Sequence, residues 1–452
     1  MGSMDRVGRK RNPLVAQNSL ARSAVDEPTS SWASWLTSVR PRRAAGQLRF
    51  SQYHTPMRHR VLESASLKLA AKATLTHHHV KHGLRLLIFA VGMLGAAVSM
   101  GAQAPAKSPA APASVVSEID AYAKRTGFSG TVHVELKGKR LVSRHYGLAD
   151  RTFGVRVDST TRFWVASITK LLTSTLIMQL VEAGHIDLNA PIRTYLPDYK
   201  GAGADKITVH HLLNHTSGLE QFEHIESYEA AVKKGMPEYQ LPHSSAELLS
   251  LYASGPVKGT PGSHFNYNNA DYIVLGAILE HVSGLSYERL LRDKLLMPLG
   301  MTSSGLMRAQ AITPNLAATY MRADSTAPLM RDLPVHSENW WASGSLYSTA
   351  ADLSKFARAL YGGRLLTRGS METLLKPGRD NYAYGLWVAS QEIGGKQHRF
   401  AQRPGQIMGA NVTLLRYLDD DLTVIILGNT NLADIDRFGF QIGRTALRKS
   451  RN

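Results

Sequence analysis

The sequence predicts an α/β (α+β) fold in which helices flank one antiparallel sheet, both ends of the chain complete that sheet, and a helical subdomain is inserted between the ends. Two observations carry this prediction. Strand patterns gather in residues 131–143 and 384–428, whereas helical patterns and loops dominate residues 167–341. The chain has 452 residues, of which 43% are hydrophobic, so it can bury a large core.

The order of the elements follows from local periodicity. Residues 114–124 carry apolar side chains at helical spacing and end before Gly127, which predicts an N-terminal helix. Residues 131–136 alternate, and the chain returns through residues 141–143 after a turn, which predicts two antiparallel strands. Near the other end we predict four strands and a closing helix, at residues 384–389, 400–403, 411–417, 422–428 and 432–447.

An apolar run of 13 residues, 86–98, follows Lys81 and Arg85 and precedes small residues that end at Ala104. This order is typical of a secretory signal, so residues 85–104 are predicted to be a signal peptide or, if they are not cleaved, a membrane anchor. We therefore expect a secreted or periplasmic protein that meets the membrane only through an uncleaved leader.

Residues 1–84 mix Ser, Arg, His and Ala without periodicity, which predicts a disordered basic extension. A signal core that begins so far along a chain is unusual. Our hypothesis is that the start is mis-assigned and that the natural start lies near Val80. Prolines among Ala and Ser predict a semi-rigid linker at residues 105–113, and residues 114–452 are predicted to form one domain.

Charge and composition exclude several classes of protein. The formal net charge is +18, but 15 of the 53 basic residues and only 4 of the 35 acidic residues lie in residues 1–104. We therefore expect no nucleic-acid partner, because such proteins concentrate their cations on the folded part. The chain has no cysteine and no H-E-x-x-H, P-loop or G-x-S-x-G motif, and we expect neither a metal nor a cofactor.

Ser167 and Lys170 form the only S-x-x-K in the chain, at the head of an apolar run that ends at Gly184. The run predicts a buried helix, and a serine at its start lies near the partly positive helix end, which favours the charge that develops during attack. A lysine three residues later lies on the same face, where burial would lower its pKa and let it accept the serine proton. The alternative is that Ser167 caps the helix while Lys170 turns outward.

Tyr267 and Asn269 form the only Y-x-N in the chain, 100 residues after Ser167. A tyrosine phenol near two cations can pass a proton near neutral pH, and an amide beside it can hold a lysine or a substrate carbonyl. The two motifs together favour nucleophilic catalysis by a serine.

With these motifs the chain resembles the serine β-lactamase-like family of class C β-lactamases, DD-peptidases and β-lactamase-fold esterases. Three further stretches carry the resemblance, at residues 212–219, 298–302 and 344–353. The resemblance implies an α/β sandwich with a helical subdomain and an acyl-enzyme mechanism. In that mechanism Ser167 attacks, Lys170 and Tyr267 move the proton, and Asn269 orients.

The family's third motif is K-T-G or H-x-G on the strand beside the active site. Met408-Gly409 resembles the P-G that follows this motif in the family, and counting back from it places the motif at Arg403-Pro404-Gly405. The resemblance then implies that Arg403 grips an anionic or polar end of the substrate and that Gly405 lets the substrate approach the backbone. Pro404 is tolerable on an edge strand, but it offers no hydroxyl to the carboxylate of a β-lactam.

By the same resemblance, the backbone N–H groups of Ser167 and Gln406 form the oxyanion hole. An alternative alignment puts His398 in the place of the cation. His215 invites assembly of a Ser-His-Asp triad, but in the family its stretch is a structural turn, and we expect a hydrogen-bonded loop histidine.

The sequence therefore predicts an exported serine hydrolase that acts through an acyl-enzyme. Its substrate would be a small ester, a D-amino-acid peptide of the cell-wall type or a β-lactam, and Pro404 favours the first two. The alternative is a non-catalytic protein on the same fold that binds peptidoglycan or a partner protein.

Overall fold

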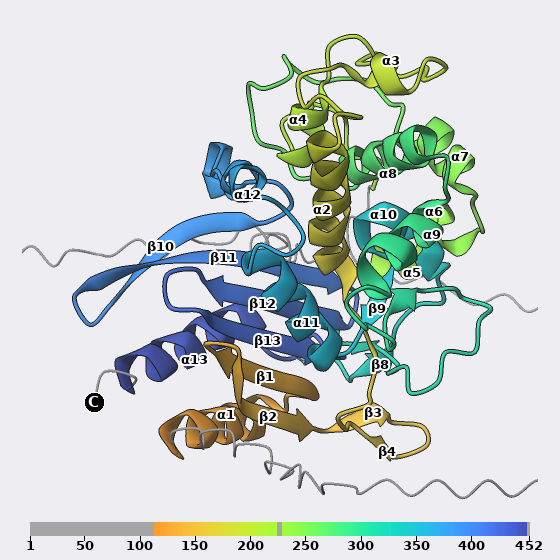
Figure 1. Ribbon diagram of the computed structural model, residues 1–452. Helices are drawn as coiled ribbons and strands as arrows, with labels where there is room; N and C mark the ends of the chain where they lie inside the picture. The colour runs from red at the N-terminus through yellow and green to blue at the C-terminus, as the bar shows by residue number, and fades with distance from the viewer. Residues whose placement is uncertain (1–112, 224–227, 325, 450–452) are drawn as a thin grey trace, which may run out of the picture. The chain divides into compact units, whose positions relative to one another are not determined.

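The computed structural model describes residues 113–449, apart from residues 224–227 and 325. Its centre is a six-stranded antiparallel sheet with the strand order β10-β11-β12-β13-β1-β2 (Figure 1). The strands are β1 (Gly130–Leu136), β2 (Lys139–Tyr146), β10 (Trp387–Ile393), β11 (Lys396–Ile407), β12 (Ala410–Tyr417) and β13 (Leu422–Gly428). The predicted antiparallel sheet is confirmed.

The two ends of the domain meet in the middle of this sheet. β1 pairs with β13, so that Gly130 lies opposite Gly428 and Leu136 lies opposite Leu422. On its other side β1 pairs with β2. The prediction that both chain ends complete one sheet is therefore correct.

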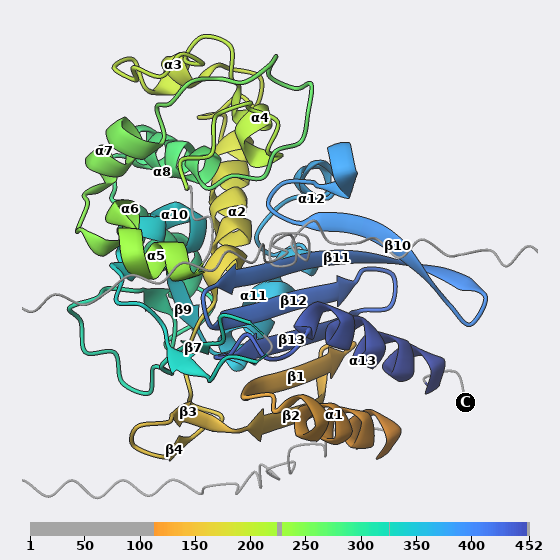
Figure 2. The ribbon, with the colours of Figure 1, turned by 180° about the vertical axis from the view of Figure 1, so that it is seen from behind.

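Helices cover both faces of the sheet (Figures 1 and 2). α1 (Ala113–Thr126) and α13 (Ile435–Lys449) pack on one face, in a core that includes Leu415 and Ile426. α11 (Ala350–Tyr361) packs on the other face, in a core that includes Leu414 and Ile425. Successive side chains of a strand point to opposite faces, and both faces of this sheet are covered. β13 is therefore buried along its whole length.

A mainly helical region lies between the two groups of strands, as predicted. In Figure 1, α2 (yellow) runs from the sheet into this region. The helices are α2 (Thr169–Glu182), α3 (Ile192–Tyr195), α4 (Val209–Leu213), α5 (Tyr228–Lys234), α6 (Pro237–Gln240), α7 (Ser245–Glu247), α8 (Ala270–Ser283), α9 (Tyr287–Leu291) and α10 (Trp341–Gly344), and α12 (Arg368–Leu374) follows α11. Every residue of α2 from Thr169 to Met178 is buried, which agrees with the predicted buried helix.

Short strands connect these parts. β5 (Phe163–Trp164), β9 (Leu346–Ser348) and β6 (Gly305–Leu306) form a three-stranded sheet. Its strand β5 comes just before α2 in the sequence. Two further pairs are β3 (Leu148–Asp150) with β4 (Val155–Arg156) and β7 (Tyr320–Met321) with β8 (Met330–Arg331). The sequence analysis did not predict these short strands.

Two strands differ from their predicted positions. The strand predicted at 384–389 begins later, at Trp387, because Ala383 donates a hydrogen bond to the carbonyl of Leu386 and Gly385 has a φ of +83°, which makes a tight turn. β11 is longer than the predicted 400–403, since its polar residues also pair with β10 and β12.

Pro404 lies on β11, which is the second strand of the sheet rather than an edge strand, so that part of the prediction is wrong. The proline is tolerated because β10 pairs with β11 only as far as Gln402, and Pro404 is paired on one side only, opposite Thr413.

The basic extension, the signal peptide or anchor, and the linker are predicted in residues 1–112, which lie outside the described residues. Within the part of the chain that the structure describes, no helix is both long enough and apolar enough to cross a membrane.

Candidate active site

Ser167 lies in a 3-10 turn, Ala166–Ile168, that leads directly into α2. β5 and β9 hold the entry to this turn, because they pair antiparallel and Val165 donates a hydrogen bond to the carbonyl of Leu346. Ala166 has a φ of +46°, a left-handed conformation that costs a non-glycine residue about 1–3 kcal/mol. The chain therefore holds Ser167 at the N-terminal end of a buried helix through a strained turn.

Lys170 follows one turn later and is fully buried. Its Nζ donates to Ser167 Oγ at 3.2 Å, to Asn269 Oδ1 at 2.6 Å and to the carbonyl of Ser343 at 2.9 Å. The alternative in which Lys170 turns outward is therefore wrong. Burial lowers the pKa of Lys170, and the nearby Arg403 lowers it further, although Tyr267 opposes both effects.

Tyr267 approaches the nucleophile from the loop before α8. Its Oη lies 2.9 Å from Ser167 Oγ, and its ring lies 4.9 Å from Lys170 Nζ. Burial alone would raise the pKa of Tyr267, but the charges of Arg403 and Lys170 outweigh burial and hold the pKa below its ordinary value. The structure thus places Ser167, Lys170 and Tyr267 in mutual contact.

Arg403 lies beneath Tyr267 and is almost fully buried. One terminal nitrogen, Nη2, donates to Tyr267 Oη at 2.7 Å, and the other, Nη1, donates to Tyr382 Oη at 2.9 Å. The guanidinium also packs over the ring of Trp387. The sequence analysis expected Arg403 to grip the substrate, whereas the structure directs both terminal nitrogens to tyrosine hydroxyls.

Gly405 brings β11 against the nucleophile. A Cβ at this position would lie 2.9 Å from the backbone nitrogen of Ser167 and 2.8 Å from the carbonyl oxygen of Val165. The next residue, Gln406, is exposed. The absence of a side chain at Gly405 lets the two backbone segments run side by side.

His398 does not occupy the place of the cation. It lies on β11 five residues before Arg403, which corresponds to about 17 Å along a strand. Its Nδ1 pairs with the carboxylate of Asp420 at 2.6 Å. The structure therefore favours the alignment that places Arg403 at the active site.

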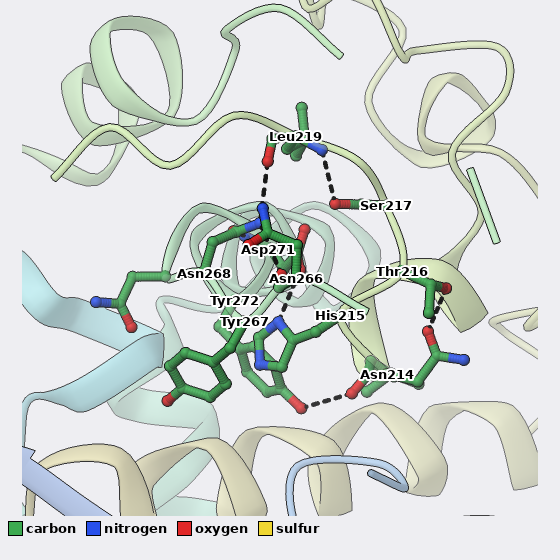
Figure 3. A network of polar contacts seen from close by, with 12 residues as sticks. Asn214, His215, Thr216, Ser217, Leu219, Asn266, Tyr267, Asn268, Asp271 and Tyr272 are labelled. Carbon is green, nitrogen blue, oxygen red and sulfur yellow. Dashed lines mark hydrogen bonds and ion pairs between the residues drawn. The ribbon is translucent and has the colours of Figure 1, made fainter. Parts of the chain in front are cut away.

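His215 forms a fully buried pair with Asp271, with 2.7 Å between Nδ1 and Oδ2 (Figure 3). The imidazole packs beside Tyr267, with 4.3 Å between the ring centroids. Burial, reinforced by Lys170 and Arg403, holds the pKa of His215 well below its ordinary value. The pair packs against the ring of Tyr267. It is not part of a Ser-His-Asp triad, because Ser167 Oγ contacts Lys170 and Tyr267 instead.

The sequence analysis missed four residues around this site, Glu223, Asp271, Tyr382 and Trp387. Glu223 Oε1 accepts a hydrogen bond from Asn269 Nδ2 at 2.8 Å. Asp271 lies in the loop-to-helix stretch that carries the Y-x-N, and its position two residues after Asn269 could have suggested a role. The other three lie far from both motifs along the chain, so no local pattern pointed to them.

Within residues 113–449, leaving aside the gaps named above, no group of three or more His, Cys, Asp or Glu side chains is arranged to hold a metal ion. The contacts of Ser167 Oγ with Lys170 and Tyr267 fit nucleophilic attack by the serine, with proton transfer to and from these two neighbours.

Comparison with curated proteins identifies relatives of this chain. It is 32% identical over 275 residues to PbpX of Bacillus subtilis (strain 168), which carries the name of a penicillin-binding protein, and the match covers 60% of this chain and 65% of that protein. It is 26% identical over 276 residues to teichoic acid D-alanine hydrolase of Staphylococcus aureus, with the same coverage. The chain thus spans about 65% of the length of each of these relatives.

Solved structures share the fold. The penicillin-binding protein of Bacillus halodurans matches with a TM-score of 0.62 and 26% identity, over 73% of this chain and 98% of that one. D-amino acid amidase of Ochrobactrum anthropi SV3 matches with a TM-score of 0.63 and 24% identity, over 75% and 99% of the two chains. The sequence also matches the family described as Beta-lactamase over residues 115–439. From its S-x-x-K and Y-x-N motifs, its fold and this match, the chain belongs to the Beta-lactamase family.

Proposed function

We propose that this protein is an exported serine hydrolase that acts through an acyl-enzyme on esters and D-aminoacyl compounds. The observation that carries the proposal is the pair of contacts made by Ser167 Oγ, 3.2 Å from the Lys170 amine and 2.9 Å from the Tyr267 phenol. A serine needs an adjacent base, and here two groups with lowered pKa values flank it.

In the first half-reaction Ser167 Oγ attacks the substrate carbonyl carbon, and its proton passes to the Lys170–Tyr267 pair. The tetrahedral intermediate then collapses, the bond to the leaving group breaks, and the pair returns the proton to the departing oxygen or nitrogen. In the second half-reaction a water molecule loses a proton to the same pair and attacks the acyl carbon. The bond from that carbon to Ser167 Oγ then breaks, the acid leaves, and the pair returns the proton to Ser167 Oγ. Asn269 holds the Lys170 amine in place throughout.

The backbone N–H groups of Ser167 and Gln406 form the oxyanion hole of the proposed reaction. Gly405 supports this assignment. A Cβ at this position would lie only 2.9 Å from the Ser167 nitrogen, so a residue without a side chain lets β11 approach the nucleophile closely. Two backbone donors on rigid elements can stabilise the charge on the carbonyl oxygen without reorganisation.

The proposed substrate class rests on Pro404 and on the relatives. Pro404 has no hydroxyl for the carboxylate of a β-lactam, which disfavours that class. The relatives named above include a teichoic acid D-alanine hydrolase and a D-amino acid amidase, and the fold neighbour EstCE1 is described as a hydrolase with promiscuous acyltransferase activity. The proposed export rests on the signal pattern at residues 85–104.

Labelling with a fluorescent fluorophosphonate tests the proposal. We expect the protein to be labelled, and Ser167→Ala to abolish both labelling and hydrolysis of p-nitrophenyl acetate. Ser217→Ala is the control, since Ser217 is also a buried serine but lies in the loop beside α4. A protein that is folded but never labelled would support the alternative of a non-catalytic binder, and labelling that persists in Ser167→Ala would reject the nucleophile.

A further inference from the structure

The side chain of Asn269 lies between a base and an acid. Its Oδ1 accepts from Lys170 Nζ at 2.6 Å, and its Nδ2 donates to Glu223 Oε1 at 2.8 Å. The two contacts use opposite ends of one amide. Lys170 is thereby connected to a carboxylate on a different segment of the chain.

An amide can rotate by 180° and exchange its oxygen and nitrogen. If Asn269 rotated, its NH₂ would face the Lys170 amine, and two donors would oppose each other. The amide therefore needs a second contact that distinguishes its two ends. A carboxylate oxygen is such a contact, because it accepts hydrogen bonds, and at a pH above its pKa the carboxylate has no proton to donate.

Glu223 is itself held in place. Gln221 donates from Nε2 to the other carboxylate oxygen, so each oxygen of Glu223 has a protein donor. Burial raises the pKa of Glu223 to about 7, with Glu238 acting in the same direction while Asn269 and Lys170 oppose it. Glu223 is half-buried, and a carboxylate with an amide donor on each oxygen is held in one orientation.

We propose that Glu223 is a positioning residue that fixes the orientation of Asn269 and, through it, the Lys170 amine. This inference rests on the proposed function, in which Lys170 takes the proton of Ser167. Glu223 acts through its hydrogen bond to Asn269 and touches neither Ser167 nor the reacting carbonyl.

The first test compares two substitutions. Glu223→Gln keeps a carbonyl oxygen for Asn269, so we expect kcat for p-nitrophenyl acetate within about threefold of the wild type. Glu223→Ala frees the amide, and we expect kcat to fall at least about tenfold with little change in KM, the size of one lost hydrogen bond to a charged group. Glu238→Gln is the matched control, because it removes a neighbouring carboxylate that makes no contact with Asn269, and it should leave kcat unchanged.

The second test exchanges the polarity of the contact. Asn269→Asp places two carboxylates against each other and should lower kcat strongly, because one must bind a proton. Adding Glu223→Gln then provides an N–H donor for the new carboxylate, so we expect it to raise kcat in that background. A substitution that is slightly harmful alone and beneficial with Asn269→Asp is the signature of a direct contact.

The remaining outcomes separate this inference from the proposed function. If Glu223→Ala and Asn269→Ala lower kcat additively, or if Glu223→Gln does not improve Asn269→Asp, Glu223 does not act through Asn269 and the inference is wrong. That result leaves the proposed function standing as long as Ser167→Ala abolishes fluorophosphonate labelling. If Glu223→Ala fails to fold, as judged by circular dichroism, the comparison of Asn269→Asp with and without Glu223→Gln still tests whether Glu223 acts through Asn269.

Discussion

Arg403 offers the sharpest test of the electrostatics of the site. Its Nη2 donates to Tyr267 Oη at 2.7 Å, and its charge lowers the pKa values of both Tyr267 and Lys170. Arg403→Met keeps the unbranched apolar stem and removes the charge. The pKa of whichever group takes the proton from Ser167 must then rise.

The size of this change follows from the contact. A hydrogen bond between a charged and a neutral group contributes about 1.5–3 kcal/mol, and one pKa unit corresponds to about 1.4 kcal/mol. The pKa should therefore rise by about one to two units. Since the deprotonated form is active, the acidic limb of the kcat/KM profile should move to higher pH by the same amount, and at pH values on the wild-type acidic limb the rate should fall about 10- to 100-fold.

The assay is hydrolysis of p-nitrophenyl acetate between pH 5 and 10, corrected for the spontaneous reaction. Activity of Arg403→Met should approach that of the wild type at the alkaline end. Tyr382→Phe is the matched control, because it removes the partner of the other guanidinium nitrogen and leaves the contact with Tyr267, so its acidic limb should stay within about half a unit of the wild type. A profile for Arg403→Met that falls equally at every pH would refute the reasoning, since it would show a loss of substrate binding or folding.

Three further predictions concern neighbouring positions. Lys170→Arg should be nearly as inactive toward p-nitrophenyl acetate as Lys170→Ala, because a guanidinium keeps the charge but cannot be deprotonated; an arginine variant with most of the activity would make Lys170 an electrostatic partner only. Gly405→Ala should lower the esterase rate at least about tenfold and destabilise the fold by about 1–3 kcal/mol in urea unfolding, because its Cβ would lie 2.9 Å from the Ser167 nitrogen. The wild type should hydrolyse p-nitrophenyl esters but nitrocefin weakly or not at all, and Pro404→Thr should raise the nitrocefin rate more than the ester rate, by about one to two decades; equal changes in both rates would show that this position does not set specificity.

The parts of the site that lie in local motifs could be predicted from the sequence. Ser167 and Lys170 are one helical turn apart, and Tyr267 and Asn269 share one short loop, so residue type and spacing were enough to single them out. The strand with Gly405 was found by its distance from Met408-Gly409. The first two inferences needed only neighbours in the sequence, whereas the strand with Gly405 also needed the resemblance to the family.

The contacts between distant segments could not be predicted in this way. The orientation of Arg403 depends on Tyr382, which reaches it from the turn before β10, and that turn also displaced the predicted strand. Glu223 is one of several acids in its stretch of sequence, and only the fold brings it to Asn269. Residue type and spacing report such pairings poorly, because they carry no information on which loops meet.

The position of β1 between β2 and β13 has a consequence for biosynthesis. β1 is made early, yet its partner strand ends at Gly428, so a ribosome must complete nearly the whole domain before the central pairing can form. Pairing across such a long chain separation is slow. The same delay applies to Arg403, which contacts Tyr267, and to Gly405, which lies beside Ser167, because both belong to β11. In the proposed reaction, a chain that carries Ser167 but not yet β11 lacks Arg403 and Gln406, so we expect its nucleophile to become reactive only late in folding.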